Sequence, residues 1–505
     1  MIHRSVAAAL CFASGLLLVD GTRADDAAAP KSAIAAEDYL LVRDGWAEER
    51  LGHWPRAVNA DRQTDAESRS PTEADPAPHL GNDDENRPQH ASGLGMAGNP
   101  AAVNIVVGNG ALGRLLGIEE ESGFRLGGMW LGDASAVLSG GFEGGEWGLN
   151  NLVIVDLSLD AEKRWGWEGA SFGTQYLDYT GQPTNQLAGT VQGFDGVQAT
   201  PPFNRSELYQ LWWRQEWFDG LLITRLGKSV PTFDFNNVLS AVPVGNDASN
   251  IPAVTSLIYT PIFVNPTMFG RLPGYYDSAT GLTATLAPAD NAYASYGVYD
   301  GSQAHGEHTG LLGPQFDGYY FNIGEIGATW LYGPEAKPGK FGIGLWHQTG
   351  ALELPNHQFD NGETGVYLFA SQRLWFQQPG VNHNGVSGFV QYGANDSDSS
   401  WVRQYFGAGF TAFGLVPSRP NDSQGVGMAW SILNNDPNAG YFFFPNAPGP
   451  STALNSNELM MAGYYQAALS KWAFLQPTLT YIPNPGSRPD VPAAFASSVY
   501  LTLLF

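Results

Sequence analysis

The sequence predicts an all-β protein whose strands form a transmembrane antiparallel β-barrel. Three observations favour this fold class: the alternating final segment, the composition, and similar alternation in many earlier segments. The final segment runs from Phe495 to Phe505, and its apolar residues mostly recur at every second position, as in a strand with one apolar face. A tilted strand of this length can cross a bilayer. Because lipid cannot satisfy an unpaired strand edge, we expect the barrel to be closed.

The two faces of this last strand differ in chemistry. Val499, Leu501 and Leu503 fall on one parity, whereas Ser498 and Thr502 fall on the other. In a membrane barrel the apolar parity faces lipid and the polar parity faces a wet lumen. Taken alone, the segment suits the last strand of a soluble sandwich equally well.

The composition is typical of alternating strands joined by tight turns. Only 15% of the residues are charged, against roughly 25% in average proteins. The chain has 62 glycines and 12% aromatic residues, yet its mean hydropathy is only -0.18. These values argue against a helical membrane protein and against a disordered chain. The formal net charge of -24 argues against nucleic acid as a partner.

Residues 1–24 have the pattern of a secretory signal peptide. His3 and Arg4 precede a short apolar run over 6–19, and small residues predict cleavage after Ala24. The only cysteine, Cys11, lies inside this segment. A mature chain without cysteine has no disulfide, no thiolate metal site and no cysteine nucleophile.

Residues 25–107 are predicted to form an N-terminal periplasmic arm. Ser32 can cap a short helix that continues to about Arg50. Residues 59–92 are polar and almost free of large apolar side chains, which predicts a disordered linker. The barrel is expected to occupy residues 108–505.

From about Phe124 onward the sequence repeats the pattern of strand, turn and strand. Polar parities carry Asp, Glu and Arg beside Trp and Tyr, which is typical of a lumen wall, and a barrel of this kind has short periplasmic turns and long extracellular loops. The residues predicted to face lipid include Val153, Val155, Leu157, Leu159, Tyr209, Leu211, Trp213, Trp217, Phe341, Ile343, Leu345, Val366, Leu368, Leu459, Met461, Leu475 and Leu479.

Several stretches between residues 108 and 505 resemble a known family. They are Leu187–Phe194, Glu207–Trp213, Gly274–Ser278, Tyr296–Gly301, Phe341–His347, Gly365–Trp375 and Leu475–Gly486. The last is the most specific, and its Pro-Asn-Pro-Gly suits a tight reversal before the final strand. In these stretches the chain resembles the carbohydrate-selective porins of Gram-negative outer membranes, the OprB-like porins.

The resemblance implies a barrel of 16 strands in the cell outer membrane. It implies passive diffusion of mono- and small oligosaccharides or polyols, with preference set by a constriction in the lumen. The expected partners are these carbohydrates, outer-membrane lipid and lipopolysaccharide, and the barrel-assembly machinery, which would engage the strand ending at Phe505. No cofactor is expected. Monomer and trimer both remain open.

A sugar pore needs polar groups that replace water around hydroxyls and aromatic faces that meet the C–H face of the ring. Binding must also stay weak enough for exit. The polar parities supply the candidate substrate-binding residues Asp156, Trp212, Arg214, Glu216, Trp346, Gln348, Tyr367, Arg373, Trp375, Glu458 and Gln466. Arg225 and Lys228 have opposite parity, so a regular strand turns at most one of them inward, and the sequence does not decide which.

No motif in the sequence predicts catalysis. Gly108–Gly113 matches G-x-G-x-x-G, but alternation resumes at Phe124, so the pattern indicates a short helix before the first strand rather than a nucleotide site. His305, Glu307 and His308 lie close together in a polar loop without further ligands, and we expect no specific metal there. We therefore predict a channel and not an enzyme.

Two alternatives to a sugar porin remain. One is a general or cation-preferring porin, which would show a large reversal potential in a KCl gradient and no block by sugars. The other is an exported all-β protein that binds polysaccharide, which would be recovered without detergent.

Overall fold

The computed structural model describes residues 111–119, 122–199, 201–231, 234–236, 238, 265–274, 277–289, 291–379, 384–447, 452–470 and 473–505. The predicted signal peptide at 1–24 and the predicted arm at 25–107 lie outside the described residues.

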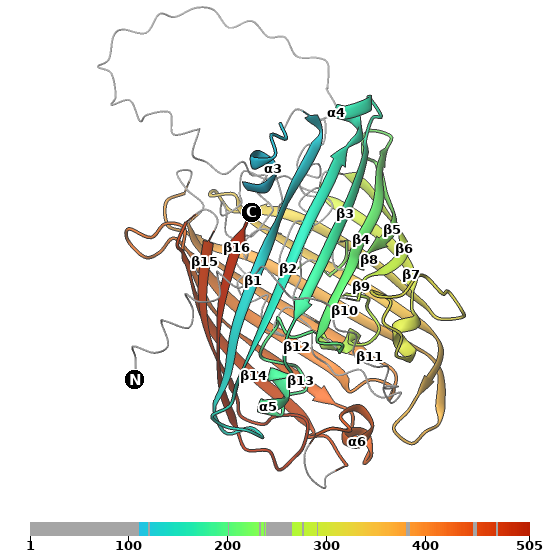
Figure 1. The fold of residues 1–505 in the computed structure, drawn as a ribbon, viewed down its shortest axis with the longest axis vertical. Coiled ribbons are helices and arrows are strands. Elements are labelled where there is room, and N and C mark those ends of the chain that lie inside the picture. Colours follow the sequence, from blue (N-terminus) through green and yellow to red (C-terminus); the bar gives the residue numbers. More distant parts are fainter. Residues whose placement is uncertain are drawn as a thin grey trace, which may run out of the picture. The chain divides into compact units, whose positions relative to one another are not determined.

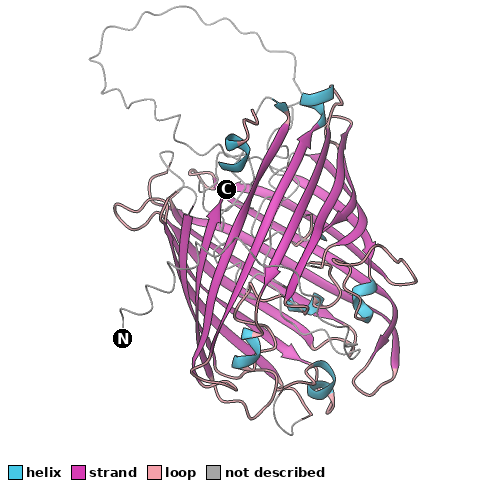
Figure 2. Ribbon diagram, viewed as in Figure 1, coloured by secondary structure: helices cyan, strands magenta, loops and turns pink. Residues whose placement is uncertain are grey.

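The described residues contain sixteen strands that close into one antiparallel barrel (Figures 1 and 2). Each strand pairs with its neighbours in sequence, and the first pairs with the last. The strands are β1 (Phe124–Ser139), β2 (Trp147–Asp160), β3 (Ala170–Thr180), β4 (Asn204–Trp217), β5 (Leu222–Ser229), β6 (Ala279–Ala289), β7 (Ala292–Asp300), β8 (Tyr320–Tyr332), β9 (Lys337–Glu353), β10 (Phe359–Phe376), β11 (Gly385–Asn395), β12 (Val402–Phe413), β13 (Ser423–Leu433), β14 (Asn457–Ala468), β15 (Ala473–Ile482) and β16 (Ala494–Leu504).

The helices are short, and in chain order they lie before the first strand or between strands. They are α3 (Ala111–Leu115), α4 (Ala161–Trp165), α5 (Thr184–Ala188), η7 (Pro266–Met268), η8 (Ser302–His305) and α6 (Ala439–Phe443). α3 lies where the sequence predicted a short helix before the first strand. None of the helices that the structure describes has the length and apolar character needed to cross a membrane.

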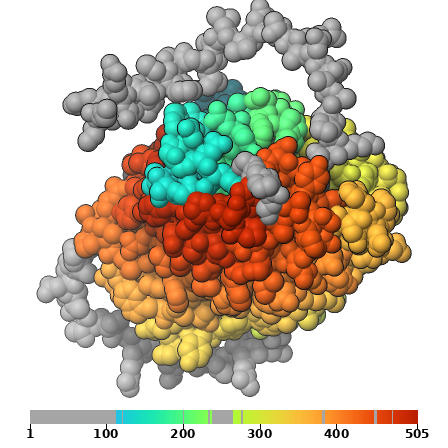
Figure 3. Space-filling model, turned by 90° about the horizontal axis from the view of Figure 1, so that it is seen from below, coloured from blue at the N-terminus to red at the C-terminus, as the bar shows by residue number. Residues whose placement is uncertain are grey.

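The carboxyl terminus closes the barrel. Phe505 and Gly128 exchange two backbone hydrogen bonds, of 2.8 and 3.0 Å, and the β1–β16 pairing continues from Met129↔Leu504 to Ser139↔Phe495. In the space-filling view, cyan atoms of the first strands lie beside red atoms of the last ones (Figure 3). The last strand thus has both edges paired, as predicted.

The connections at the two ends of the barrel differ in length. Short connections join β4 to β5, β6 to β7, β8 to β9 and β14 to β15, whereas the segments 181–203, 230–278, 301–319 and 434–456 are long. The structure describes these long segments except for residues 200, 232–233, 237, 239–264, 275–276 and 448–451, and their described parts are called loops below. Because membrane barrels keep short turns in the periplasm and long loops outside, we call these the turn end and the loop end. α3, α4 and the carboxyl terminus lie at the turn end, and α5 and α6 at the loop end (Figure 1).

The alternation of faces in β16 follows the prediction. Val499 is 41% exposed on the outer face, whereas Ser498 and Thr502 are buried inside the barrel. Trp217 and Trp330 are exposed near the turn end, where aromatic side chains match the membrane–water interface.

The predicted lipid-facing position of Tyr209 is wrong. Tyr209 is only 2% exposed and lies on the inner side of β4. Gln175 pairs with Gln210 and Tyr176 pairs with Leu208, so Tyr209 is the extra residue of a β-bulge. One extra residue resets the alternation of faces, and the alternating pattern of β4 does not reveal where that happens.

Candidate functional site

Most of the predicted substrate-binding residues face the interior of the barrel. Glu216 has the inward parity of Arg214 but keeps a side chain that is 22% exposed. The others that point inward are buried: Asp156, Trp212, Arg214, Trp346, Gln348, Tyr367, Arg373, Glu458 and Gln466. Contact of these residues with a permeating sugar stays a prediction.

Trp375 is the exception, and its predicted place in the lumen is wrong. Its side chain is 46% exposed on the outer face of β10. Arg373 pairs with Ser387 and Trp375 pairs with Val386, so Leu374 is an extra residue that turns Trp375 outward. A tryptophan near the end of a strand suits the interfacial girdle of a membrane barrel.

The inward-facing aromatic side chains lie flat against the wall rather than projecting into the lumen. Trp212 is directly opposite Gly173 across the β3–β4 ladder, and a Cβ at Gly173 would clash with the Trp212 ring. Trp346 lies over Gly365 in the same way. Glycine thus provides the space in which an aromatic ring packs on the neighbouring strand.

The wall at β4 and β5 concentrates charge. Nη1 of Arg214 is 2.7 Å from Oε1 of Glu216, and Arg214 is directly opposite Arg225. Arg225 lies over the Trp212 ring at 5.0 Å and is 3.5 Å from Asp234. The two carboxylates offset the repulsion between two guanidinium groups on adjacent strands.

The structure also decides between Arg225 and Lys228. Arg225 is buried inside the barrel. It pairs with Arg214 on the neighbouring strand, and paired residues face the same side of a sheet. Lys228 donates to the backbone carbonyls of Leu208 and Gly310, so it links β5 to the loop before β8. One face of the Trp212 ring lies over Gly173, and the guanidinium of Arg225 covers the other. The ring therefore makes a cation–π contact with Arg225 and offers no open face for a sugar to stack on.

The loop at 181–203 enters the barrel and is held from its interior wall. Oε1 of Glu458 accepts from Thr190 Oγ1 at 2.7 Å and from the backbone N–H of Gln192 at 3.0 Å, and Oε2 accepts from Val191 N at 3.0 Å. Asp195 accepts from Asn150 at 2.7 Å, and burial raises the pKa of Asp195. Glu458 therefore anchors the loop at 181–203 to the wall, a role that the sequence analysis did not predict for it.

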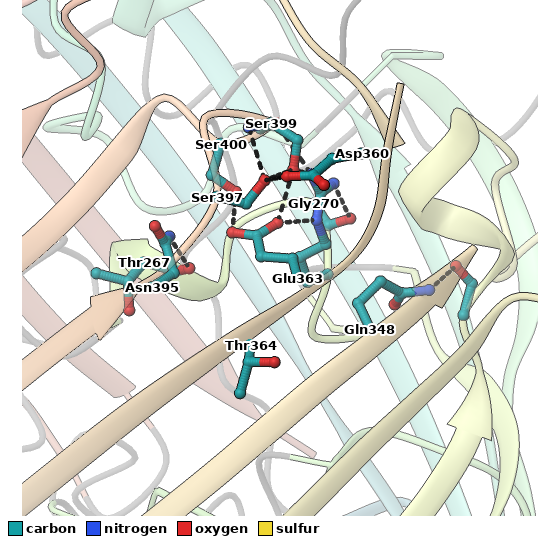
Figure 4. Close-up of polar contacts among 12 residues, drawn as sticks. Thr267, Gly270, Gln348, Asp360, Glu363, Thr364, Asn395, Ser397, Ser399 and Ser400 are labelled. Carbon is teal, nitrogen blue, oxygen red and sulfur yellow. Dashed lines mark hydrogen bonds and ion pairs between the residues drawn. The ribbon is translucent and has the colours of Figure 1, made fainter. Parts of the chain in front are cut away.

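Described residues of the loop at 230–278 are held at another part of the wall. Arg271 Nε is 2.6 Å from Glu363 Oε2, and Glu363 also accepts from Ser399 and from Ser400. Figure 4 shows Glu363 pointing toward these serines, while the neighbouring Thr364 points away. Because Glu363 belongs to the inner face of β10, the ion pair fixes this loop inside the barrel.

A second contact holds the same loop through Glu325. The backbone N–H of Asn236 donates to Glu325 Oε2 at 2.7 Å, and the hydroxyls of Tyr293 and Tyr367 donate to the same carboxylate. Tyr367, a predicted sugar contact, therefore uses its hydroxyl to support a loop anchor. Glu325 and Glu363 are residues that the sequence analysis missed, because alternation identifies inward positions but not their long-range partners.

Another charged cluster lies at the loop end of β4. Arg205 is 3.0 Å from Glu207 and 2.9 Å from Asp277, and His308 is 3.7 Å from Asp277. Burial disfavours the charged form of Asp277, but Arg205 and His308 outweigh this effect and lower its pKa. The cluster joins the loop at 230–278 to the loop at 301–319.

A few predicted residues keep polar atoms without a partner. Nη2 of Arg214, Nε1 of Trp346, Oε1 of Gln348 and Oε1 of Gln466 are buried and make no hydrogen bond within the described part of the chain. An unmet buried polar atom costs about 1–3 kcal/mol. These atoms are suited to an exchangeable partner such as water or a sugar hydroxyl.

Comparison with known proteins places this barrel in a family. Residues 153–504 match the family described as carbohydrate-selective porin, OprB family. The chain belongs to this family. Porin B of Pseudomonas aeruginosa is 22% identical over 426 residues, which cover 77% of this chain and 88% of that protein. The high-pH structure of OprB from Pseudomonas putida matches with a TM-score of 0.66 at 18% identity, over 79% of this chain and 99% of the other.

Family membership and fold agree with the predictions from the sequence. The chain is an outer-membrane porin of the carbohydrate-selective family, with the sixteen-stranded antiparallel barrel that the resemblance implied. The family is one of channels, which favours transport over catalysis.

Proposed function

We propose that this porin passes neutral mono- and small oligosaccharides or polyols by passive diffusion and selects them at the β4–β5 wall. The observation that carries the proposal is the pairing of Arg214 with Glu216 on the inner face of β4, beside Arg225. Together these side chains present donors and an acceptor at neighbouring inward positions.

This arrangement suits sugar hydroxyls for a simple reason. Each hydroxyl both donates and accepts a hydrogen bond, whereas a guanidinium only donates and a carboxylate only accepts. A paired cation and anion therefore match adjacent hydroxyls and exert little net field on a neutral solute. Weak binding of this kind replaces part of the hydration of the sugar and still allows its release.

The two inward loops supply the second requirement, which is a narrow passage. The loop at 181–203 is held by Glu458 and Asp195, and the loop at 230–278 is held by Glu363 and Glu325. A permeating solute then passes between the anchored residues of these loops and the wall. We propose that size selection rests on these loops and chemical selection on Arg214 and Glu216.

Arg214→Gln tests the proposal in a planar bilayer. Sugar block of the single-channel current is measured with glucose, other monosaccharides and disaccharides. Loss of a charge-assisted hydrogen bond is expected to weaken the block about tenfold or more, while conductance changes little. Arg419→Gln, in the turn between β12 and β13, is the matched control and should behave as the wild type.

Two outcomes would contradict the proposal. An unchanged block in Arg214→Gln would remove Arg214 from the selective site. A wild-type channel that conducts ions and is blocked by no sugar would be a general porin, and a large reversal potential in a KCl gradient would then mark it as cation-preferring.

A further inference from the structure

Exposed aromatic side chains gather at the loop end of the barrel, and we call His357, Tyr441 and Phe442 the mouth cluster. His357 lies in the loop between β9 and β10, and its side chain is 75% exposed. Tyr441, in α6, is 65% exposed, and Phe442 beside it is partly exposed. Aromatic side chains at loop tips are outside the band of lipid that would otherwise explain their exposure.

Contacts hold the mouth cluster in a defined arrangement. The rings of His357 and Phe442 meet edge to face at 6.1 Å, although their loops belong to strands that are not neighbours. Phe442 packs on Phe443 at 4.9 Å, and Phe443 packs on Trp401 at 5.7 Å. The rings of His357 and Phe442 are therefore supported by buried aromatic rings, and Tyr441 precedes Phe442 in α6.

The protruding β9–β10 hairpin brings His357 to this place. Pairing between β8 and β9 ends at Phe321↔Gln348, but pairing between β9 and β10 continues to Glu353↔Phe359. The hairpin thus extends past its neighbour β8 at the loop end. At its tip, His357 contacts Phe442 of α6. Nδ1 of His357 is hydrogen-bonded to Oε1 of Glu353 at 2.8 Å.

The mouth cluster is connected to the interior. Trp401, at the base of the cluster, packs on Phe269 at 5.8 Å, and Phe269 belongs to the inward loop at 230–278. The aromatic contacts therefore lead from the exposed tip to the segment that narrows the lumen. A solute that rests on the mouth cluster is positioned next to the passage.

We propose that the mouth cluster is a capture site for the transported carbohydrate, which docks the apolar C–H face of a pyranose ring on Tyr441 and Phe442. A pyranose has one apolar face and a polar edge. The aromatic rings complement the apolar face, and the carboxylate of Glu353, which is joined to Phe442 through His357, can accept from the polar edge. In contrast, the Trp212 ring in the lumen is covered by Gly173 and Arg225. Capture at the mouth raises the local sugar concentration and the rate of association from the loop side. This inference rests on the proposed function.

The test measures sugar block from each side of the membrane. Protein is inserted in one orientation into a phospholipid bilayer, and glucose or a disaccharide is added to one chamber at a time. Tyr441→Ala and the double variant Tyr441→Ala/Phe442→Ala are expected to lower the association rate from the loop side about two- to tenfold, the size that one or two aromatic contacts supply. The association rate from the turn side and the conductance should stay as in the wild type.

Two controls separate aromatic capture from general damage. Tyr441→Phe keeps the ring and should retain the wild-type association rate. Trp165→Ala removes an exposed aromatic side chain at the opposite end of the barrel and should leave the loop-side rate unchanged. Heat-modifiable migration in a gel verifies that every variant is folded.

Each outcome has a distinct meaning. An unchanged loop-side rate in the double variant, with block from the turn side intact, overturns the capture site and leaves the proposed function standing. Absence of sugar block from both sides in the wild type overturns the proposed function itself. If the rate differs between variants only when the loop-side leaflet holds lipopolysaccharide, the cluster binds the lipid sugars instead, and the proposal fails.

Discussion

At the residue scale, the charges inside this barrel are arranged in pairs and networks. Arg214 is bound to Glu216, and Arg271 to Glu363. Removing one partner of a buried pair costs more than the intact pair contributes, because the remaining charge is left in a medium that solvates it poorly. Although the formal net charge of the chain is -24, this pairing balances charge at Arg214 and Arg271, as the proposed passage of neutral solutes requires.

The pairing of Asp277 predicts a pH-dependent stability. Arg205 and His308 hold the pKa of Asp277 below its usual value despite burial. The ionised carboxylate thus stabilises the fold fully above the unfolded pKa of about 3.9, and the contribution is lost as pH falls through the lower folded pKa. Asp277→Asn is expected to be less stable than the wild type at neutral pH, with a difference that shrinks in acid.

Urea unfolding of detergent-refolded protein between neutral pH and about pH 3 measures this difference. Asp490→Asn is the control, since the Asp490 side chain is 60% exposed in its ion pair with Arg488 and exposed charges contribute little. A difference between Asp277→Asn and the wild type that stays constant over the whole pH range would contradict the assignment.

At the element scale, the strands obey alternation except where a bulge resets it. In β16 the alternation is unbroken, so each position predicts its own environment. β4 has an extra residue at Tyr209, and β10 has one at Leu374. After each of them, the side chains face the side opposite to the one that unbroken alternation would give. These are the strands where facing was assigned wrongly from the sequence.

The facing of β16 predicts opposite responses to the same substitution. Val499→Arg places a charge on the lipid face near the middle of the strand and should cost about 2–4 kcal/mol of barrel stability. Thr502→Arg places it in the lumen and should cost much less. Folding into lipid vesicles, titrated with urea, measures both, and equal losses would show that the two positions do not face opposite sides.

At the scale of the whole molecule, the barrel works together with the loops that enter it. Residues far apart in the sequence meet at the anchors, as in the contacts of Glu458 with residues 190–192 and of Glu363 with Arg271. In the function that we propose, the wall sets the diameter of the channel, the anchored loops reduce it, and selectivity depends on both.

Release of one loop should therefore change transport through the folded channel. Glu363→Ala leaves Arg271 without its carboxylate, and breaking a buried pair costs about 3–5 kcal/mol. We expect a larger single-channel conductance, weaker sugar block and faster proteolysis of the loop at 230–278. Glu335→Ala, which removes an exposed turn ion pair with Lys337, is the control. A Glu363→Ala channel with wild-type conductance and block would show that the anchor does not hold the constriction.

The sequence predicted the wall better than the contents of the lumen. Alternation is a local property, so the inward positions of Asp156, Arg214 and Gln466 could be found without a structure. The strand number followed from the resemblance to a family rather than from the alternation itself. The bulges at Tyr209 and Leu374 could not be found, because a single extra residue leaves the apolar pattern nearly intact.

The sequence by itself determined strands with one apolar and one polar face, because a period of two is a local property of the chain, and it favoured a membrane barrel over an exported all-β protein. Only the tertiary structure showed which inward residues anchor loops, as Glu458 does directly and Tyr367 does through Glu325, whereas contact of Arg214 with a solute is part of our proposal. The reason is physical. Facing depends on neighbours along one strand, whereas the partner of a buried charge depends on how distant segments meet inside the closed barrel.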